Sequence, residues 1–409
     1  MKEGKNMRKV FSVIFAAVLV FCMTFTAYAK TSKALRFGTD GKFTILQITD
    51  PQDDQHPSGD MLKLISLAIE KADPDLVVFS GDLVEDKRLG DIGTDDEDLR
   101  EGVCAYDSSG NVDHDKTLAN VRTACGYIFN EVESKSIPFA VALGNNDYQT
   151  GVTSDEWLDI LDDYPMNLTI DESSDSDGRV DYNLDILSSS DENTAFELWM
   201  MDTKTTAVTD SQLDWFKDAG AVLKSENGGV PVPSIVFQHI PVDDVGNLFE
   251  PCNIWDAGAL PSGGSFYRLN KDIANGYNKS VMLPGKTTSE FNAWKDNGGV
   301  LAAFFGHLHT EGYSGKWNGI ELGLTYGSQF AKSGPYGARV ITLHENNPAD
   351  YGDAQYVYEG SVSGSDAHIV TQIDKPYPVY NGFFESFEGY FINTFTNLWQ
   401  TIFNTLTLI

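Results

Sequence analysis

The sequence feature that most constrains the fold is a set of short apolar runs that each end in a polar group. The clearest run, Leu76-Val77-Val78-Phe79-Ser80, stops at Gly81-Asp82. A short apolar run bounded in this way is typical of a strand buried on both faces. Asp82 then follows the carboxyl end of the strand, where ligands bind in open α/β sheets. Taken alone, Asp82 is better explained as the N-cap of a following helix.

Four further apolar runs end in the same way, in side chains that bind metal ions. The five runs and their polar residues are 43–49 with Asp50 and Gln52, 76–80 with Asp82, 139–143 with Asn145, Asn146 and Asp147, 235–238 with His239, and 301–305 with His307 and His309. Only seven histidines occur in the chain, and three of them fall at these positions. We therefore interpret the runs as strands that deliver carboxylates, amides and imidazoles to one rim.

The first 29 residues have the order of a secretory signal peptide. Four lysines or arginines precede an uncharged apolar stretch from Val10 to Phe25, and Ala27-Tyr28-Ala29 supplies a small-x-small cleavage pattern. The alternative, an uncleaved membrane anchor, is disfavoured by the short apolar core. We therefore predict cleavage before Lys30 and a protein that is secreted or lies in the cell envelope.

The mature chain is strongly acidic. Cleavage removes four basic residues and one acidic residue, which takes the formal charge from -31 to -34. Such a charge repels nucleic acid and anionic membranes, so neither is an expected partner. A small phosphorylated substrate remains compatible with this charge, because bound cations would dominate the field inside a site.

Three cysteines remain after cleavage, at Cys104, Cys125 and Cys252. Outside the cytoplasm, Cys104 and Cys125 can either pair in a disulfide or remain thiols, and the sequence leaves both open. Their spacing excludes a Cys-x-x-Cys metal site. We expect cysteine chemistry to be structural.

The first half of the mature chain alternates strands and helices. Apolar residues recur at helical spacing over residues 60–72 and again over about 114–133. Strand-helix-strand order predicts a parallel sheet with right-handed crossovers. Residues 85–113 form a long acidic stretch, which is either a functional lid or, as we favour, a solvated insertion.

The polar motifs follow one another in a specific order. They are Asp50-x-Gln52, Gly81-Asp82, Gly144-Asn145-x-Asp147, His239-x-Pro241 and Gly306-His307-x-His309, with Gln212-Leu213-Asp214-Trp215 and Gly337-Ala338-Arg339-Val340-Ile341 as secondary motifs. Together they resemble the calcineurin-like metallophosphoesterase family, which includes the purple acid phosphatases, over about residues 43–345. The resemblance implies a four-layer α/β/β/α sandwich with a binuclear metal site at the strand ends.

The resemblance also implies a cofactor and a reaction. Two divalent metal ions (Mn, Fe, Zn or Ca) would be bound, and a carboxylate with two oxygens, Asp82, would bridge them. A hydroxide between the metals would attack phosphorus in a phosphate monoester or diester. By resemblance, the first metal is held by Asp50, Gln52, Asp82 and His309, and the second by Asp82, Asn145, His239 and His307.

Two residues depart from the usual pattern of the family. Gln52 replaces the commoner His, and an amide oxygen is a harder and weaker ligand, which favours Mn, Mg or Ca over Zn at the first metal. Asn146 replaces the His that assists the leaving group, and an amide cannot transfer a proton. Asp147, which orients that His in the family, is a candidate catalytic residue together with Asn146. His56 and His114 are alternative proton donors from neighbouring segments.

The predicted organisation has four parts: a signal peptide over 1–29, a phosphoesterase domain over 37–346, an extension and linker over 347–378, and an amphipathic segment over 379–409. Apolar residues recur at helical spacing in the last part, which lacks the Lys and Arg that attract anionic lipid. We expect this segment to pack on the domain or on a second subunit, and membrane contact is the alternative. The sequence does not predict an oligomeric state.

The leading hypothesis is a secreted, metal-dependent phosphoesterase that acts on a small phosphorylated substrate. The alternative is a non-catalytic, metal-bearing surface protein that binds a phosphorylated ligand, with Asn146 marking the lost chemistry. All but one of the usual metal contacts of the family are matched in residue type, which favours the enzyme.

Overall fold

The computed structural model describes residues 34–86, 102–173, 178–330, 334–360 and 366–371. The predicted signal peptide, its cleavage site and the C-terminal amphipathic segment lie outside the described residues, as does the middle of the acidic stretch. Within the described ranges, no helix is long and apolar enough to span a membrane.

The described residues form two large mixed sheets and one small sheet. The eight-stranded sheet has the order β1 (Leu35–Arg36), β5 (Tyr182–Leu187), β6 (Thr194–Met201), β7 (Ser234–Gln238), β12 (Val300–Phe305), β14 (Ile320–Leu324), β13 (Gly312–Trp317) and β11 (Ala274–Tyr277). The six-stranded sheet has the order β17 (His368–Thr371), β16 (Gly352–Glu359), β15 (Gly337–His344), β2 (Lys42–Ile48), β3 (Leu76–Phe79) and β4 (Phe139–Val141). The small sheet consists of β8 (Phe249–Cys252), β10 (Ser265–Leu269) and β9 (Leu260–Ser262).

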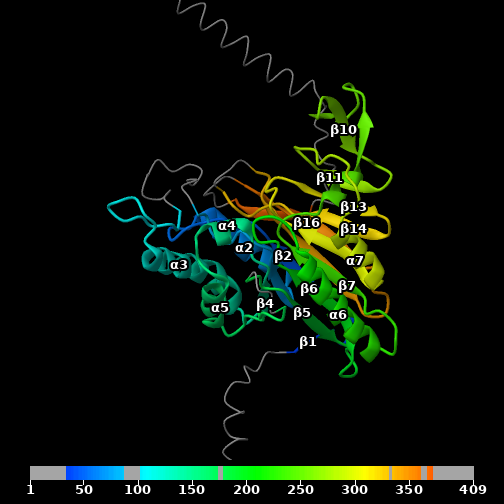
Figure 1. Cartoon of the computed structure of the whole chain (residues 1–409), viewed down its shortest axis with the longest axis horizontal. Helices are drawn as coiled ribbons and strands as arrows, with labels where there is room; N and C mark the ends of the chain where they lie inside the picture. Colours follow the sequence, from blue (N-terminus) through cyan, green and yellow to red (C-terminus); the bar gives the residue numbers. More distant parts are fainter. Residues whose placement is uncertain (1–33, 87–101, 174–177, 331–333, 361–365, 372–409) are drawn as a thin grey trace, which may run out of the picture. The chain divides into compact units, whose positions relative to one another are not determined.

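Helices flank the two large sheets. They are α2 (Gly59–Ala72), α3 (His114–Glu133), α4 (Asn145–Gln149), α5 (Ser154–Asp162), α6 (Asp210–Glu226) and α7 (Ser289–Asn297), with a 3-10 helix, η2 (Asp243–Leu248). α2 packs on β2, β15 and β17 of the six-stranded sheet, whereas α7 packs on β12 of the eight-stranded sheet and contacts α6 (Figure 1). This arrangement is the expected four-layer α/β/β/α sandwich.

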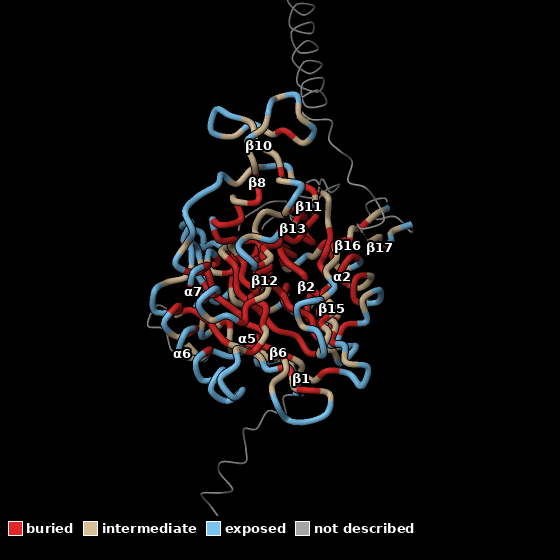
Figure 2. The backbone as a smooth tube through the Cα atoms, turned by 90° about the vertical axis from the view of Figure 1, so that its right-hand side faces the viewer, coloured by how far each residue is buried: buried red, intermediate tan, exposed pale blue. Residues whose placement is uncertain are grey.

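Two hydrophobic cores account for the layers. In β7, Ile235 and Phe237 face a core that also contains residues of β2 and β3, so this core lies between the two large sheets. Val236, between them, faces a second core that contains residues of α6 and α7. In β12, Phe304 likewise lies in the first core and Phe305 in the second. Burial therefore follows the strands of both large sheets (Figure 2).

Local sequence explains where the helices begin and end. Asp113 caps α3 by accepting a hydrogen bond from the N–H of Lys116 at 3.2 Å. The Thr209 hydroxyl accepts the N–H of Gln212 at the start of α6, and the Gln212 side chain accepts the N–H of Thr209, which is a capping box. α2 ends at Asp73, which has a left-handed conformation and precedes a proline.

The prediction of a parallel sheet is confirmed only in part. β2, β3 and β4 are parallel neighbours, as expected. β15 pairs antiparallel with β2, and β16 and β17 continue the sheet in the antiparallel sense. The predicted boundary at residue 346 is therefore wrong for the sheet, because β16 and β17 fall in the stretch that we read as an extension and linker.

The three cysteines of the predicted mature chain form no disulfide in the structure. Cys104 and Cys125 are both buried, and burial raises the pKa of the Cys125 thiol well above its usual value. The disulfide that the sequence left open between these two residues is therefore not formed. Cys125 packs in the hydrophobic core as a small apolar group, whereas Sγ of Cys104 donates to the carbonyl of Thr150 at 3.8 Å.

Candidate metal centre

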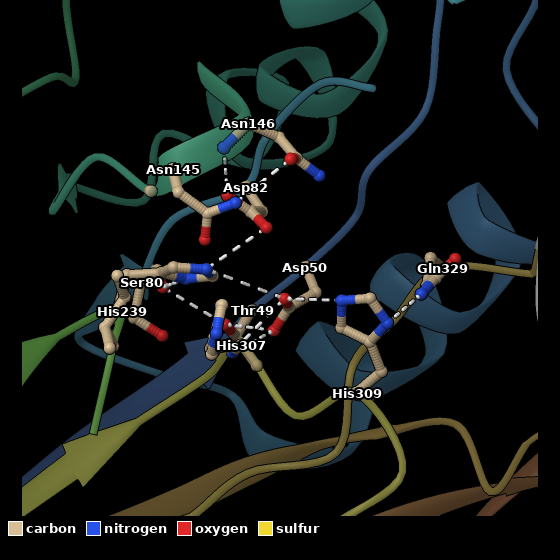
Figure 3. A network of polar contacts seen from close by, with 12 residues as sticks. Thr49, Asp50, Ser80, Asp82, Asn145, Asn146, His239, His307, His309 and Gln329 are labelled. Carbon is tan, nitrogen blue, oxygen red and sulfur yellow. Dashed lines mark hydrogen bonds and ion pairs between the residues drawn. The ribbon is translucent and has the colours of Figure 1, made fainter. Parts of the chain in front are cut away.

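The five predicted strand ends meet at one edge of the sandwich. β2, β3 and β4 are parallel neighbours in one sheet, and β7 and β12 are parallel neighbours in the other, so their carboxyl ends align. Backbone hydrogen bonds join the loops that follow: the N–H of Asp50 donates to the carbonyl of Gly81 at 3.0 Å, and the N–H of Gly306 donates to the carbonyl of His239 at 3.1 Å. Side chains from distant parts of the chain therefore converge (Figure 3).

Two buried carboxylates form the middle of this cluster. Oδ2 of Asp82 lies 3.1 Å from Nε2 of His239, and Oδ1 of Asp82 accepts the backbone N–H of Asn146 at 2.8 Å. Oδ1 of Asp50 lies 3.3 Å from Nε2 of His309 and 3.9 Å from Nε2 of His239. Each carboxylate therefore has imidazole nitrogens close to it, as in a site where both kinds of group face a cation.

These side chains form two groups that are suited to metal binding, and Asp82 belongs to both. One group is Asp82, His239 and His307, and the other is Asp50, Asp82 and His309. Within each group, one ligand atom per residue lies within 4.8 Å of the others. A carboxylate shared by two groups is the geometry that a bridged pair of ions requires.

Two polar atoms at the centre are buried and have no hydrogen-bond partner among the described residues. They are Oε1 of Gln52 and Oδ1 of Asn145. An unpaired buried polar atom costs about 1–3 kcal/mol, so such atoms are rare and need an explanation. Both carry lone pairs, and metal ions would satisfy them together. The residues present therefore fit a binuclear centre.

The backbone fixes the orientation of the His239 ring. Nδ1 of His239 lies 2.9 Å from the carbonyl oxygen of Ser80, which can only accept, so Nδ1 carries a proton and Nε2 faces Asp82. Burial lowers the pKa of His239, but Asp82 and Asp50 outweigh burial and raise this pKa to about 10. The centre thus strongly attracts positive charge at Nε2. A metal ion would displace the proton there.

The predicted metal ligands include several strained residues. Among the described residues, nine that are not glycine have positive φ angles, and five of these are predicted ligands. They are Asp50 (50°), Gln52 (44°), Asp82 (50°), His307 (72°) and His309 (41°). Each such residue costs on the order of 1 kcal/mol. Strain concentrated in this way is typical of functional sites.

Glycines in two of the motifs allow the loops to approach closely. A Cβ atom at Gly144 would lie 2.2 Å from the backbone nitrogen of Asp82, and one at Gly306 would lie 1.9 Å from Oγ1 of Thr49. Neither contact is sterically tolerable. Any larger residue would therefore push the Asp82 or Asp50 loop away from its neighbours.

Asn146 and Asp147 hold the other residues of the centre in place. Oδ1 of Asn146 accepts a hydrogen bond from Nδ2 of Asn145 at 3.0 Å, which leaves Oδ1 of Asn145 directed away as the unpaired ligand atom. Asp147 accepts the backbone N–H groups of Leu83 and Val84 at 2.8 and 3.2 Å, and that of Gly144 at 2.8 Å. Asp147 thereby joins the loop that carries Asp82 to the loop that carries Asn145.

The two alternative proton donors have other environments. Nε2 of His114 pairs with Oε1 of Glu156 at 2.7 Å, and this contact raises the pKa of His114. His56 is exposed. Neither histidine belongs to the two groups suited to metal binding. The structure therefore gives no support to either as the substitute for the missing family histidine.

Sequence reasoning missed three residues that support the centre: Thr49, Ser80 and Gln329. The hydroxyl of Thr49 donates to Oδ2 of Asp50 at 2.7 Å. Ser80 contributes its carbonyl to His239, and the amide nitrogen of Gln329 lies 2.6 Å from Nδ1 of His309. Thr49 and Ser80 directly precede motifs, which was a usable signal. Gln329 follows its partner by 20 residues and had none.

A buried polar chain connects the centre to the core between the sheets. The side chain of Gln47 donates to the hydroxyl of Ser80 at 2.8 Å and accepts from that of Thr325 at 2.7 Å. Nε of Arg339 in turn donates to the Thr325 hydroxyl at 2.9 Å, and the Arg339 guanidinium also pairs with Asp353. The chain crosses from the six-stranded sheet to the end of β14. It therefore couples the packing of the two sheets to the residues that hold His239.

The sequence model described as "Calcineurin-like phosphoesterase" matches residues 43–311. The chain belongs to the calcineurin-like phosphoesterase family. This family model spans all five strand ends, so it covers every residue that we predict to bind metal.

Two relatives and one solved structure illustrate the similarity. "Probable inactive purple acid phosphatase 14" of Arabidopsis thaliana is 22% identical over an alignment of 391 positions, which covers 84% of this chain and 86% of that protein. "Probable inactive purple acid phosphatase 29" of the same organism is 22% identical over an alignment of 375 positions, which covers 81% of this chain and 83% of that protein. A dimetal phosphatase from Danio rerio matches with a TM-score of 0.42 at 11% identity, covering 80% of this chain and 98% of that one.

Proposed function

We propose that this protein is a binuclear metal-dependent phosphoesterase that hydrolyses phosphate monoesters or diesters. The observation that carries the proposal is the position of Asp82, which is shared by two groups of metal-binding side chains. Sharing of this kind is not needed for folding, and it would allow Asp82 to contact two cations. Two adjacent divalent ions are the usual equipment for displacement at phosphorus.

The proposed ligands divide between two ions. When bound, the ions would supply a nucleophile by lowering the pKa of water, and they would neutralise charge that develops on the phosphoryl oxygens. Mn, Fe, Zn and Ca all remain candidates for these ions. Asp50, Gln52, Asp82 and His309 would hold the first ion, and Asp82, Asn145, His239 and His307 the second.

Asn146 and Asp147 have separate roles in this proposal. Asn146 accepts from the Asn145 side-chain nitrogen, so the Asn145 oxygen would be available to hold the second ion, and the Asn146 amide nitrogen remains a candidate donor to a phosphoryl oxygen. Asp147 is a positioning residue, because both of its carboxylate oxygens accept backbone N–H groups of the metal-bearing loops. Neither side chain is arranged as a proton donor to a leaving group.

The proposed substrates are therefore esters whose leaving groups need no proton. Asn146 cannot transfer a proton, and general acid catalysis typically contributes ~100-fold or more. The leaving group of an aryl phosphate is a stabilised phenolate, whereas that of an alkyl phosphate is a strongly basic alkoxide. We expect turnover of the first class and slow turnover of the second.

A turnover screen tests the proposed function. Aryl and alkyl phosphate monoesters and diesters are assayed with Mn, Fe, Zn and Ca added separately to metal-stripped protein. The D82N variant is the control, since it leaves the size of the side chain unchanged. Metal-dependent turnover that D82N lacks supports the proposal. Turnover that is unchanged in D82N, or that needs no metal, contradicts it.

A second candidate function is a metal-bearing protein that binds a phosphorylated ligand without hydrolysing it. The contact between Asn146 and Asn145 favours this second candidate. Asn146 stands where the family has its proton-donating His, and here its side chain instead orients Asn145, a proposed metal ligand. The two Arabidopsis relatives are both named inactive. Two bound ions and saturable binding of inorganic phosphate, without turnover in the screen, would support this candidate over the enzyme.

We further propose that the protein acts outside the cytoplasm, because residues 1–29 have the order of a secretory signal peptide. Expression of the full chain in a secretion-competent host tests this. N-terminal sequencing of exported protein should begin at Lys30. Retention in the cytoplasm with an intact N-terminus would contradict the proposal.

A further inference from the structure

Gln329 lies directly behind one of the proposed metal ligands. Its side chain is buried, with 2% of its surface exposed, in the segment between β14 and β15. The amide nitrogen lies 2.6 Å from Nδ1 of His309, while Nε2 of the same ring lies 3.3 Å from Oδ1 of Asp50. The His309 ring thus stands between Gln329 and Asp50 (Figure 3).

The orientation of the Gln329 amide determines what His309 can do. If the amide nitrogen donates to Nδ1, a neutral ring carries its proton on Nε2, and that proton points toward Asp50. A ring in this form cannot bind a metal ion through Nε2. If the amide oxygen accepts instead, Nδ1 carries the proton and Nε2 presents its lone pair. The two arrangements differ in which nitrogen of a neutral ring carries the proton.

A second observation shows that the amide has an unused acceptor. Oε1 of Gln329 is buried and has no hydrogen-bond partner among the described residues. A half-turn of the amide would bring Oε1 to the position from which the nitrogen now contacts Nδ1. This orientation is the one that metal-binding histidines generally require, because their second nitrogen donates to an acceptor that fixes the ring.

We propose that Gln329 is a positioning residue: its amide can donate to Nδ1 of His309 or, after a half-turn, accept from it, and binding of a metal ion at Nε2 would require the second orientation. The inference rests on the proposed metal centre and deepens it. The first metal site is then conditional, since the amide and the ring must rearrange together before Nε2 can bind.

His239 provides a comparison within the same centre. Its Nδ1 lies 2.9 Å from the carbonyl oxygen of Ser80, and a carbonyl can only accept. A neutral His239 ring therefore carries its proton on Nδ1 and presents Nε2, whereas His309 is held by a group that can both donate and accept. The two sites should differ in how strongly they depend on their supporting residue.

Two substitutions separate the proposed role from simple packing. Q329E supplies only acceptors, so it should keep His309 in the metal-binding form and retain first-site affinity. Q329M has a similar length but no acceptor, and it should weaken the first site by about 10–100-fold, the usual effect of losing such a partner. The matched control is Q355M: the Gln355 amide is also buried, and its Nε2 donates to the carbonyl of Leu324 at 2.7 Å rather than to a proposed ligand.

The experiment is calorimetric titration of metal-stripped protein with Mn²⁺, followed by NMR of the imidazole nitrogens in Zn²⁺-loaded protein. We expect two sites in the wild type and in Q355M, a weakened first site in Q329M alone, and rescue in Q329E. Nδ1 of His309 should carry the proton in the loaded protein and Nε2 in the metal-free protein. Urea unfolding of the metal-free variants checks that each one folds.

Each result bears on one inference. If Q329M binds Mn²⁺ as tightly as the wild type, if Q329E is weakened as much as Q329M, or if the ring keeps the same tautomer in both states, the role of Gln329 is wrong while the metal centre stands. If the wild type binds no metal, the proposed function fails as well.

Discussion

Asp82→Asn should abolish both metal sites, whereas Asp50→Asn should abolish one. Asp82 belongs to both groups of metal-binding side chains, and Asp50 belongs to only one of them. Asn has nearly the same size as Asp, but it lacks one negative charge and cannot bridge two cations well. We expect metal analysis to find about two ions in the wild type, one in Asp50→Asn, and none in Asp82→Asn.

The size of the effect follows from ligand linkage. Metal at 100 times the dissociation constant stabilises the folded state by about 2.7 kcal/mol per site, so two such sites give about 5 kcal/mol. Loss of a directly binding carboxylate should weaken a site by more than the ~100-fold limit seen for supporting residues. Each weakened site then contributes under about 0.4 kcal/mol. At about 2 °C per kcal/mol, the metal-induced rise in Tm falls from roughly 10 °C to below about 2 °C.

The assay is thermal unfolding with and without metal, alongside metal analysis by mass spectrometry. His307→Ala is a further control, because His307 belongs to the group that does not contain Asp50. Asp50→Asn and His307→Ala should each retain about half of the rise in Tm. The reasoning would be refuted if Asp82→Asn kept one ion and half of the rise, since Asp82 would then serve a single site.

Three further predictions concern leaving groups, the core and pH. Asn146→His should raise turnover of alkyl phosphates by up to ~100-fold but that of aryl phosphates much less, at equal metal content; equal gains would indicate phosphate binding instead. Arg339→Met leaves Asp353 without its cation and should lower the free energy of unfolding in urea by about 3–5 kcal/mol. Adding Asp353→Leu should restore most of this loss, and no recovery in the double variant would contradict a net ion-pair effect. Burial raises the pKa of the Glu290 carboxyl from 4.5 to about 8, so the folded state favours its neutral form. The stability that the protein has below pH 4.5, where this carboxyl is neutral in both states, is therefore lost as the pH rises through 8. Glu290→Gln should therefore be more stable than the wild type at pH 9 by roughly 3–5 kcal/mol but similar at pH 5, and a variant without this difference would show that Glu290 is ionised in the folded state.

The parts of the fold that depend on local sequence were predictable. The periodicity of residues 114–133 gives α3 with the bounds that the structure shows, because one apolar stripe decides both burial and helix phase. The apolar run from Leu76 to Phe79 forms β3, with every residue buried. These elements need no distant partner to be recognised.

Elements defined by distant pairing were not predictable in the same way. β16 lies in a stretch that we read as an extension, and its residues are mixed in polarity and partly exposed in the structure. It pairs with its sequence neighbours β15 and β17, and β15 joins these strands to the distant β2, where Leu343 pairs with Phe43. Nothing within residues 352–359 specifies that distant pairing.

The candidate ligands were found because their motifs directly follow apolar runs. Their supporting groups were harder to find, since residue type does not mark a supporting backbone carbonyl, even where the residue adjoins a motif, as Ser80 does. Gln329 acts across the fold rather than along the chain. The contact between Asn145 and Asn146 depends on side-chain rotation, which spacing in sequence cannot reveal.

The left-handed backbone of the five strained residues has an evolutionary consequence. Glycine or asparagine adopts this conformation more readily than Gln52 or His307 does, so mutation toward them would relieve strain. A descendant that no longer bound metal would gain stability from these substitutions to glycine or asparagine, and it would lose no function. Selection for stability alone would therefore erode these positions first, and a chain that keeps carboxylates, an amide and imidazoles there retains them against that pressure.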